Sequence, residues 1–216
     1  PSSVDYAHFA QARSLADTAP DQKDLPRPRI GYAGVIDERI DLDLIRHAAE
    51  QRPDWQFIMI GPVVKVSPDD LPRLPNIHWL GQKSYDELPV YFAGWDVAMM
   101  PFALNDSTRF ISPTKTPEFL SAGLPVVSTP IRDVVRQYGD VGLVRIADSP
   151  ESFLSQADGA MTYGLGLKGK QRTDAFLRTL SWDQTWAAMN AVIEERLEAK
   201  KPASAGLAPQ IASAAG

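Results

Sequence analysis

Residues 109–130, RFISPTKTPEFLSAGLPVVSTP, contain a loop, a short helical pattern and an apolar strand in direct succession. The loop carries two cations, Arg109 and Lys115, on either side of a Ser-Pro turn. The helical pattern ends at Gly123 and leads straight into PVVSTP, which predicts a strand at 125–130. A helix that hands the chain directly to an apolar strand is typical of a parallel α/β sheet.

The same pattern repeats on both sides of this stretch. The other strands are predicted at 29–34, 55–61, 76–81, 97–102 and 142–147. The other helices are predicted at 41–52, 84–95 (in part), 131–138, 150–162, 168–179 and 182–200. The strands are continuously apolar, as in sheets covered on both faces. We therefore predict an α/β fold, a Rossmann-like doubly wound parallel sheet of about six strands.

The 216 residues are enough for one α/β core, and composition divides them into three parts. Residues 1–28 are polar and interrupted by prolines, and we expect an interdomain segment and linker there. Residues 29–200 form the predicted sheet domain. The tail, 201–216, consists mostly of Ala, Ser, Gly and Pro, and we expect it to be disordered.

Composition argues against several classes of function. A net charge of -5 disfavours nucleic-acid binding through a broad basic surface. The chain has no cysteine, and its three histidines lack metal-ligand spacing, so we expect no metal site. No apolar run approaches the roughly 20 residues that cross a bilayer, so we expect no transmembrane segment. The first residue is Pro rather than Met, which suggests a fragment or a processed chain.

Ligands of open parallel sheets bind beyond the carboxyl ends of the strands, where 102–118 is predicted to lie. Two readings of Arg109 and Lys115 are open. The cations either pair with Asp106 or Glu118 in a solvated loop, or they receive an anion such as phosphate.

The start of the helix in this stretch has two predicted positions. Thr116 is the N-cap if regular hydrogen bonding begins at Pro117, and Ser112 is the N-cap if it begins at Pro113. In both cases free backbone amides face the ligand edge.

Other residues at the edge also allow two readings each. Glu118 is favoured in a first helical turn by the dipole alone, or it accepts hydrogen bonds from ribose hydroxyls. Tyr85 packs on a flat base or is a structural aromatic. Ser84 and Glu87 are spaced for a capping box. Further along, Trp182 and Trp186 are expected to dock the last helix onto the domain.

Known catalytic motifs are missing from the sequence. GYAGVIDERID (31–41) lacks the G-x-G-x-x-G fingerprint, which disfavours a NAD-binding domain. There is no P-loop, no G-x-S-x-G, no H-E-x-x-H and no cysteine nucleophile. Any chemistry must therefore rest on electrostatics at 109–118.

SPTKTPEFLSAGLPVVST (112–129) resembles the S-P-x-K-x-x-E-x-x-A-A-G-x-P-V-V stretch of retaining GT-B glycosyltransferases of the family 4 type (glycosyl transferases group 1), in their C-terminal, donor-binding domain. PSSVDYAHFAQA (1–12) is similar to the segment with which these enzymes enter that domain. IHWLGQKSYDELPVYFAGWDVAMMPF (77–102) and SWDQTWAAM (181–189), the latter like the last helix, add to the resemblance, which covers about residues 1–198.

The resemblance implies a glycosyltransferase whose donor, a nucleotide-diphosphate sugar, binds in this domain without a metal or other cofactor. Arg109 and Lys115 would neutralise the diphosphate and are the implied catalytic residues. The implied donor-binding residues are Gly34, Arg39, Gly81, Gln82, Lys83, Tyr85, Ser112, Pro113, Thr114, Thr116 and Glu118.

Two departures from the family pattern leave the donor sugar open. Phe110 stands where the family has the first Glu of its E-x7-E pair. The family also has an Arg and a Lys after the first strand, and here only Arg39 lies near that position. The resemblance also implies an N-terminal acceptor-binding domain that this chain lacks, so we expect the chain alone to transfer no sugar.

We expect the protein to work in the cytoplasm in polysaccharide biosynthesis, and to reach the inner membrane only through that other domain. The alternatives are a noncatalytic nucleotide-sugar-binding or interaction module, and half of a nucleotide-sugar epimerase.

Overall fold

The computed structural model describes residues 3–180 and 182–200. Six parallel strands form one sheet in the order β3-β2-β1-β4-β5-β6. The strands are β1 (Arg29–Ala33), β2 (Gln56–Ile60), β3 (Ile77–Gly81), β4 (Val97–Met100), β5 (Val126–Ser128) and β6 (Arg145–Ile146). The predicted Rossmann-like fold is confirmed, and each strand lies within its predicted stretch.

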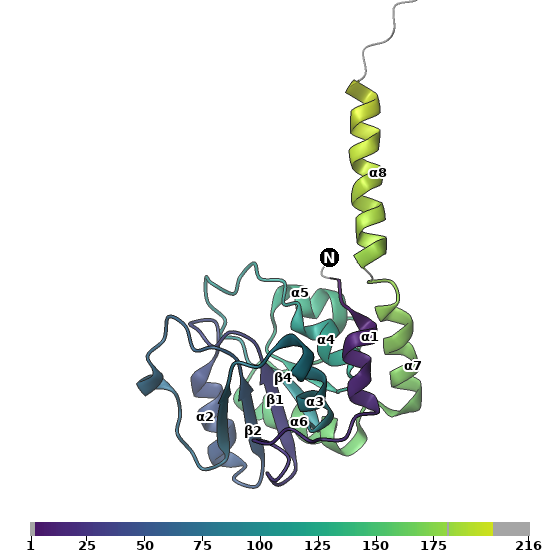
Figure 1. Ribbon diagram of the computed structural model, residues 1–216. Helices are drawn as coiled ribbons and strands as arrows, with labels where there is room; N and C mark the ends of the chain where they lie inside the picture. The colour runs from purple at the N-terminus through teal and green to yellow at the C-terminus, as the bar shows by residue number, and fades with distance from the viewer. Residues whose placement is uncertain (1–2, 181, 201–216) are drawn as a thin grey trace, which may run out of the picture.

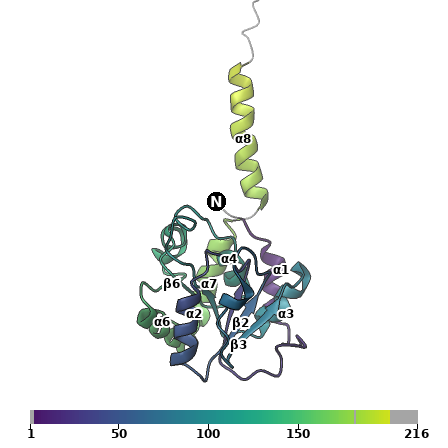
Figure 2. The ribbon, with the colours of Figure 1, turned by 90° about the vertical axis from the view of Figure 1, so that its left-hand side faces the viewer.

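Helices cover both faces of the sheet (Figures 1 and 2). They are α1 (Tyr6–Ala10), α2 (Leu42–Gln51), α3 (Leu88–Ala93), α4 (Lys115–Ser121), α5 (Arg132–Val134), α6 (Pro150–Tyr163), α7 (Gly166–Leu177) and α8 (Trp182–Lys200). A π turn, Val135–Gly139, continues α5, and 3₁₀ turns occupy Gln11–Arg13, Pro68–Asp70 and Tyr85–Glu87. Helices α2 and α6 lie on one face, while α1, α3, α4 and α7 lie on the other.

The core forms because β1, β2, β4 and β5 are buried along their whole length, as their continuous apolar runs predict. Trp55 and Trp95 are buried in it. A β-carbon on Gly31 would lie 2.0 Å from the Trp95 ring, so β1 needs a glycine where this indole crosses it.

The segment before β1 packs onto the domain, and it contains a helix that the sequence did not indicate. Phe9 of α1 is buried between α3 and the rest of the core. Arg13 Nε donates to the Ser121 carbonyl at the end of α4 over 2.7 Å, and the Arg13 guanidinium pairs with Asp174 of α7 at 2.7 Å. One arginine thus joins the segment to two helices.

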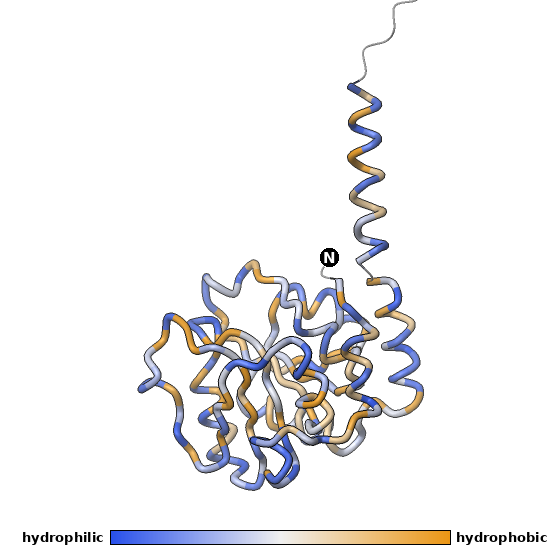
Figure 3. The backbone as a smooth tube through the Cα atoms, viewed as in Figure 1, coloured by the Kyte–Doolittle hydropathy of each residue, from blue (hydrophilic) through white to orange (hydrophobic). Residues whose placement is uncertain are grey.

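Helix α8 extends away from the body (Figure 1), and none of its residues is buried. Apolar residues recur along it (Figure 3). The side chains of Trp182 and Trp186 are 63% and 65% exposed, so the expectation that they dock the last helix onto this domain is wrong. Within the described ranges, no helix joins the length and the apolarity that spanning a bilayer requires. The expectation for 201–216 concerns residues outside these ranges.

Candidate functional site

The candidate site lies where the strand order reverses, between β1 and β4. In open α/β sheets the crevice at this point receives ligands. The Ala103 amide after β4 donates to the Arg39 carbonyl over 2.8 Å, and the Asp41 amide donates to the Pro101 carbonyl over 2.8 Å. These hydrogen bonds hold the loop after β1 against the chain that follows β4.

Glycines lie at the carboxyl ends of β1, β2 and β3, which form one edge of the sheet. The Gly34 amide donates to the Ile60 carbonyl, and the Gly61 amide donates to the Gly81 carbonyl, both over 2.9 Å. Gly61 has φ 144°, and a β-carbon there would lie 1.8 Å from the Gly34 carbonyl oxygen. The backbones approach so closely because Gly61 has no side chain. A β-carbon on Gly81 would meet no atom within 4 Å, so the backbone there is open, whereas one on Gly34 would lie 2.6 Å from the Tyr32 hydroxyl.

Arg39 is engaged by its own loop. Its Nη2 donates to the Asp37 carboxylate over 2.6 Å, and its Nε contacts both carboxylate oxygens. Burial disfavours the charged form of Asp37, but the hydrogen bonds from Arg39 outweigh burial and hold the pKa of Asp37 below its ordinary value. The Arg39 side chain is 36% exposed and lies beside the crevice, already paired.

Helix α4 begins at Lys115, and no side chain caps it. Both predicted N-caps are therefore wrong. Thr116 is fully buried and its hydroxyl donates to Met100 Sδ over 3.0 Å, so it cannot turn back to the first amides. Ser112 lies exposed ahead of the helix. Of the predicted donor-binding residues here, Ser112 and Thr114 are exposed and Pro113 is half-buried, whereas Thr116 could reach a ligand only through its backbone.

Lys115 and Glu118 form an ion pair one helical turn apart. Lys115 Nζ donates to Glu118 Oε2 over 2.7 Å, and the two side chains are 28% and 13% exposed. Burial raises the pKa of Glu118 above its ordinary value, and the charges of Lys115 and His8 offset only part of that rise. The pairing of Lys115 with Glu118, one of the two readings of the sequence, is thus present in this structure.

His8 of α1 and Tyr85 of the Tyr85–Glu87 turn lie beside this pair of α4. The His8 ring of α1 stacks on the Tyr85 ring with centroids 4.1 Å apart, and His8 Nε2 lies 3.0 Å from the Tyr85 carbonyl oxygen. Burial raises the pKa of Tyr85, and the charges of Asp5 and Glu118 add to the rise. Tyr85 is 49% exposed, and one face of its ring is covered by His8.

Some of the side chains that follow β3 are paired within the fold, and others are exposed and can contact a ligand. Lys83 Nζ pairs with Asp21 at 2.5 Å and lies 5.1 Å from the centre of the Tyr91 ring, so its charge is used within the fold. Gln82 is exposed. The predicted capping box is confirmed, because the Ser84 amide donates to Glu87 Oε2 over 2.8 Å and both halves of the box are formed. The backbone of 81–83 and the exposed Gln82 side chain therefore remain available to a ligand.

Arg109 lies in a different hollow from Lys115. Its guanidinium carbon is 5.2 Å from the centre of the Phe110 ring, and both residues line a cavity of about 460 Å³ with Asp106 and Arg132. The structure thus brings Lys115, Glu118 and Tyr85 together. It places Arg109 and Arg39 apart from them on the same edge. No sequence motif indicated that His8 joins this group; only the packing of α1 shows it.

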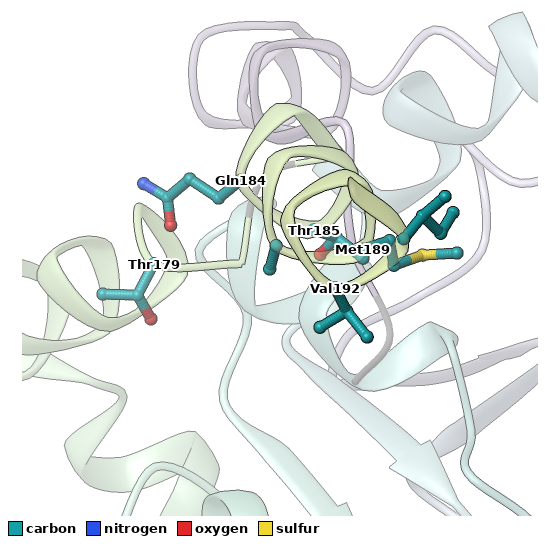
Figure 4. A pocket seen from close by; sticks show the side chains of 7 residues that line it. Thr179, Gln184, Thr185, Met189 and Val192 are labelled. Atoms are coloured by element: carbon teal, nitrogen blue, oxygen red, sulfur yellow. The ribbon is translucent and has the colours of Figure 1, made fainter. Parts of the chain in front are cut away.

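A second cavity, about 650 Å³ in volume, lies along α8 (Figure 4). Its lining, Thr179, Gln184, Thr185, Ala188, Met189, Val192 and Ile193, contains no ionisable side chain. Among residues 3–180 and 182–200, no three His, Asp or Glu side chains come together as metal ligands would. The cavity along α8 therefore offers no charge to an anionic ligand, whereas the carboxyl edge of the sheet offers Lys115 and Arg109.

A Bacillus subtilis (strain 168) protein, described as a candidate teichuronic acid biosynthesis glycosyltransferase, is 30% identical over 161 residues. The alignment covers 73% of this chain and 40% of that relative. The chain therefore spans less than half the length of the relative.

Solved structures share the fold at low identity. Sucrose-phosphate synthase from Thermosynechococcus elongatus aligns with a TM-score of 0.66 and 18% identity, over 92% of this chain and 52% of that one. The C-terminal domain of a glycosyl transferase group 1 family protein from Francisella tularensis aligns with a TM-score of 0.58 and 17% identity, over 82% of this chain and 97% of that domain.

The family described as Glycosyl transferases group 1 matches residues 27–162, which contain β1 to β6, Tyr85, Lys115 and Glu118. This match covers most of the sheet domain. The chain belongs to the glycosyl transferases group 1 family.

Proposed function

We propose that this chain binds a nucleoside-diphosphate sugar and is the donor-binding half of an enzyme that transfers the sugar to an acceptor. The proposal is carried by the half-buried pair of Lys115 and Glu118 beside Tyr85, at the carboxyl edge of the sheet. A nucleoside diphosphate needs both a cation for its phosphates and an acceptor for its ribose hydroxyls. Lys115 supplies the cation and Glu118 the acceptor, within one helical turn. The chain belongs to a glycosyltransferase family, so a nucleotide sugar is the ligand that we propose for this pair.

Each group has a role in the proposed complex. Glu118 accepts hydrogen bonds from two ribose hydroxyls, as a carboxylate does beside other nucleotides. The backbone of 81–83 meets the base, and the exposed side of Tyr85 lines it. Gly34 lets the ligand approach the end of β1, with Arg39 close by.

The reaction requires negative charge to be neutralised. When the bond between the sugar C1 and the diphosphate oxygen breaks, its electron pair stays on the diphosphate. The acceptor oxygen forms the new bond to C1 and loses its proton. Lys115 and the backbone amides at the start of α4 face the leaving diphosphate, where fixed positive charge lowers the barrier. Arg109 joins them once its loop leaves the hollow that it lines in the free chain. In this proposal these groups take the place of a metal ion.

A further domain supplies the acceptor in our proposal. The chain spans 40% of its Bacillus subtilis relative, which leaves room for such a domain there. The exposed apolar residues of α8, among them Trp182, Trp186 and Met189, provide a face for it to cover. The isolated chain should then bind donor but transfer no sugar. The name of the relative suggests polysaccharide synthesis, which starts from nucleotide sugars in the cytoplasm.

Phe110 favours a second candidate function. It is 76% exposed and occupies the position of the first Glu in the family's E-x7-E pair. A domain without that carboxylate could bind a nucleotide sugar as a noncatalytic module. Transfer of sugar by a protein that contains both domains would exclude this candidate.

Titration calorimetry with UDP, GDP, ADP and NAD tests the proposal. We expect one nucleoside diphosphate to bind best, and Lys115→Ala and Glu118→Ala each to weaken it roughly tenfold or more. Arg73→Ala, at an exposed cation outside the site, is the control and should leave affinity unchanged. Preference for NAD, or equal affinity for wild type and both site variants, would contradict the proposal. If none of the four nucleotides binds, the result would favour an interaction module.

A further inference from the structure

A cavity of about 340 Å³ lies at the opposite edge of the sheet from the candidate site. It is bordered by Pro125 and Val126, where β5 begins, and by Val144 and Arg145, where β6 begins. Lys115 and Glu118 lie on the edge where strands end. The cavity is therefore separate from the proposed donor site.

The charges that line this cavity are all positive. Arg145 and Arg172 are its only charged residues, and its remaining lining comprises glycines, apolar side chains, Pro125 and Thr173. Arg145 contacts only neutral oxygens, those of the Gln156 side chain at 3.3 Å and the Gly159 carbonyl at 3.4 Å. Within the described part of the chain, neither guanidinium forms an ion pair.

The amino terminus of α7 opens beside the cavity. Gly164, Leu165 and Gly169 line it, and α7 begins at Gly166. The first turn of this twelve-residue helix contains no acidic residue. Cations near a helix amino terminus are unfavourable, because the unpaired amides there already carry partial positive charge. An anion would compensate both the amides and the arginines.

Thr173 gives a second observation at this cavity, independent of the charges. It lines the cavity and is 1% exposed, yet its hydroxyl finds no hydrogen-bond partner among the described residues. A buried hydroxyl left unpaired destabilises a folded protein. Such groups are rare in native proteins, and an unfilled ligand site is one explanation for them.

We infer that this cavity binds a tetrahedral oxyanion, such as the phosphoryl group of a small molecule. Arg172 and Arg145 neutralise its charge, and the Thr173 hydroxyl and the amides at the start of α7 donate hydrogen bonds to it. Arginine guanidinium groups suit phosphate because their donors match pairs of phosphate oxygens.

Inorganic phosphate, titrated into the ¹⁵N-labelled chain at constant ionic strength with chloride as the reference, tests this site. The amides of Gly142, Gly164 and Gly169 should shift and saturate with phosphate only. Arg172→Gln should weaken this binding roughly tenfold. Lys170→Gln removes the same charge from an exposed position of α7 outside the lining, and should change it by less than about twofold. Equal effects of these two variants, or shifts that chloride reproduces, would overturn the inference.

Thr173→Val removes the unpaired hydroxyl while keeping the shape of the side chain. It should raise the Tm of the free chain and reduce the rise in Tm that phosphate causes. An unchanged phosphate effect in this variant would rule out the hydroxyl as a ligand. Glucose 6-phosphate is the second probe. Tighter binding than inorganic phosphate would assign the site to a phosphorylated sugar, and equal binding would assign it to the free ion.

Discussion

Lys115 Nζ lies 2.7 Å from Glu118 Oε2, so the residues proposed to hold the diphosphate and the ribose of the donor are paired with each other in the free chain. The pair sits in a half-buried position next to Tyr85. A nucleotide must therefore draw Lys115 towards its phosphates while its hydroxyls take the place of the ammonium at Glu118. Lys115 then exchanges one anionic partner for another, and Glu118 exchanges the ammonium for the hydroxyls that donate hydrogen bonds to it.

Glu118→Gln should stabilise the free chain at neutral pH. Burial raises the pKa of Glu118 in the folded chain above its pKa in the unfolded chain. The group therefore contributes its full stabilisation at pH values below the unfolded-state pKa, and this contribution is lost as pH rises through the folded-state pKa. The variant should match wild type below about pH 4.3, the ordinary pKa of Glu, and exceed it above the raised pKa. Urea unfolding at several pH values measures this.

Glu50→Gln is the control for that series, since it makes the same change at an exposed position of α2. Its effect should stay within about ±0.5 kcal/mol at every pH. A Glu118→Gln variant less stable than wild type at neutral pH would show that the ion pair with Lys115 outweighs the burial of the carboxylate.

Phe9→Ala should destabilise the chain by about 3–5 kcal/mol, because the Phe9 ring is 1% exposed and packs against the rings of Tyr85 and Phe92. Phe110→Ala makes the same truncation at a ring that is 76% exposed, and should cost less than about 0.5 kcal/mol. Denaturant unfolding of both variants measures the difference. Similar small losses for both would mean that α1 is not part of the folded core.

Removal of the residues after Leu180 should change the free energy of unfolding by less than about 1 kcal/mol, because no residue of α8 is buried. The same truncation should remove the tryptophan fluorescence most accessible to acrylamide, that of Trp182 and Trp186. A large drop in Tm on truncation would show that α8 packs on this domain in solution.

The sheet could be predicted from the sequence because its strands are buried on both faces, and such strands read as continuous apolar runs. The Asp41 cap of α2 was predictable for a similar local reason, and its carboxylate accepts from the Leu44 amide over 2.8 Å. Glu118 was found through its place in a first helical turn. These features depend on neighbours in the sequence.

Features that depend on distant contacts could not be predicted. Helix α1 has five residues, of which only Phe9 is buried, too few for a periodic pattern. Thr116 resembles an N-cap in sequence but faces Met100, because β4 lies beneath it. Arg109 and Lys115 flank one turn in the chain, yet the loop after β4 carries Arg109 towards Arg132.

The most direct test of the account is a comparison of ribo- and 2′-deoxyribonucleoside diphosphates of the preferred base, bound to wild type, Glu118→Ala and Lys115→Ala. If Glu118 holds the ribose, wild type should lose about 1.5–3 kcal/mol of binding free energy on deoxygenation. Glu118→Ala should bind both ligands equally, and Lys115→Ala should weaken both while keeping the wild-type difference. A ribose preference that survives unchanged in Glu118→Ala would contradict the central claim.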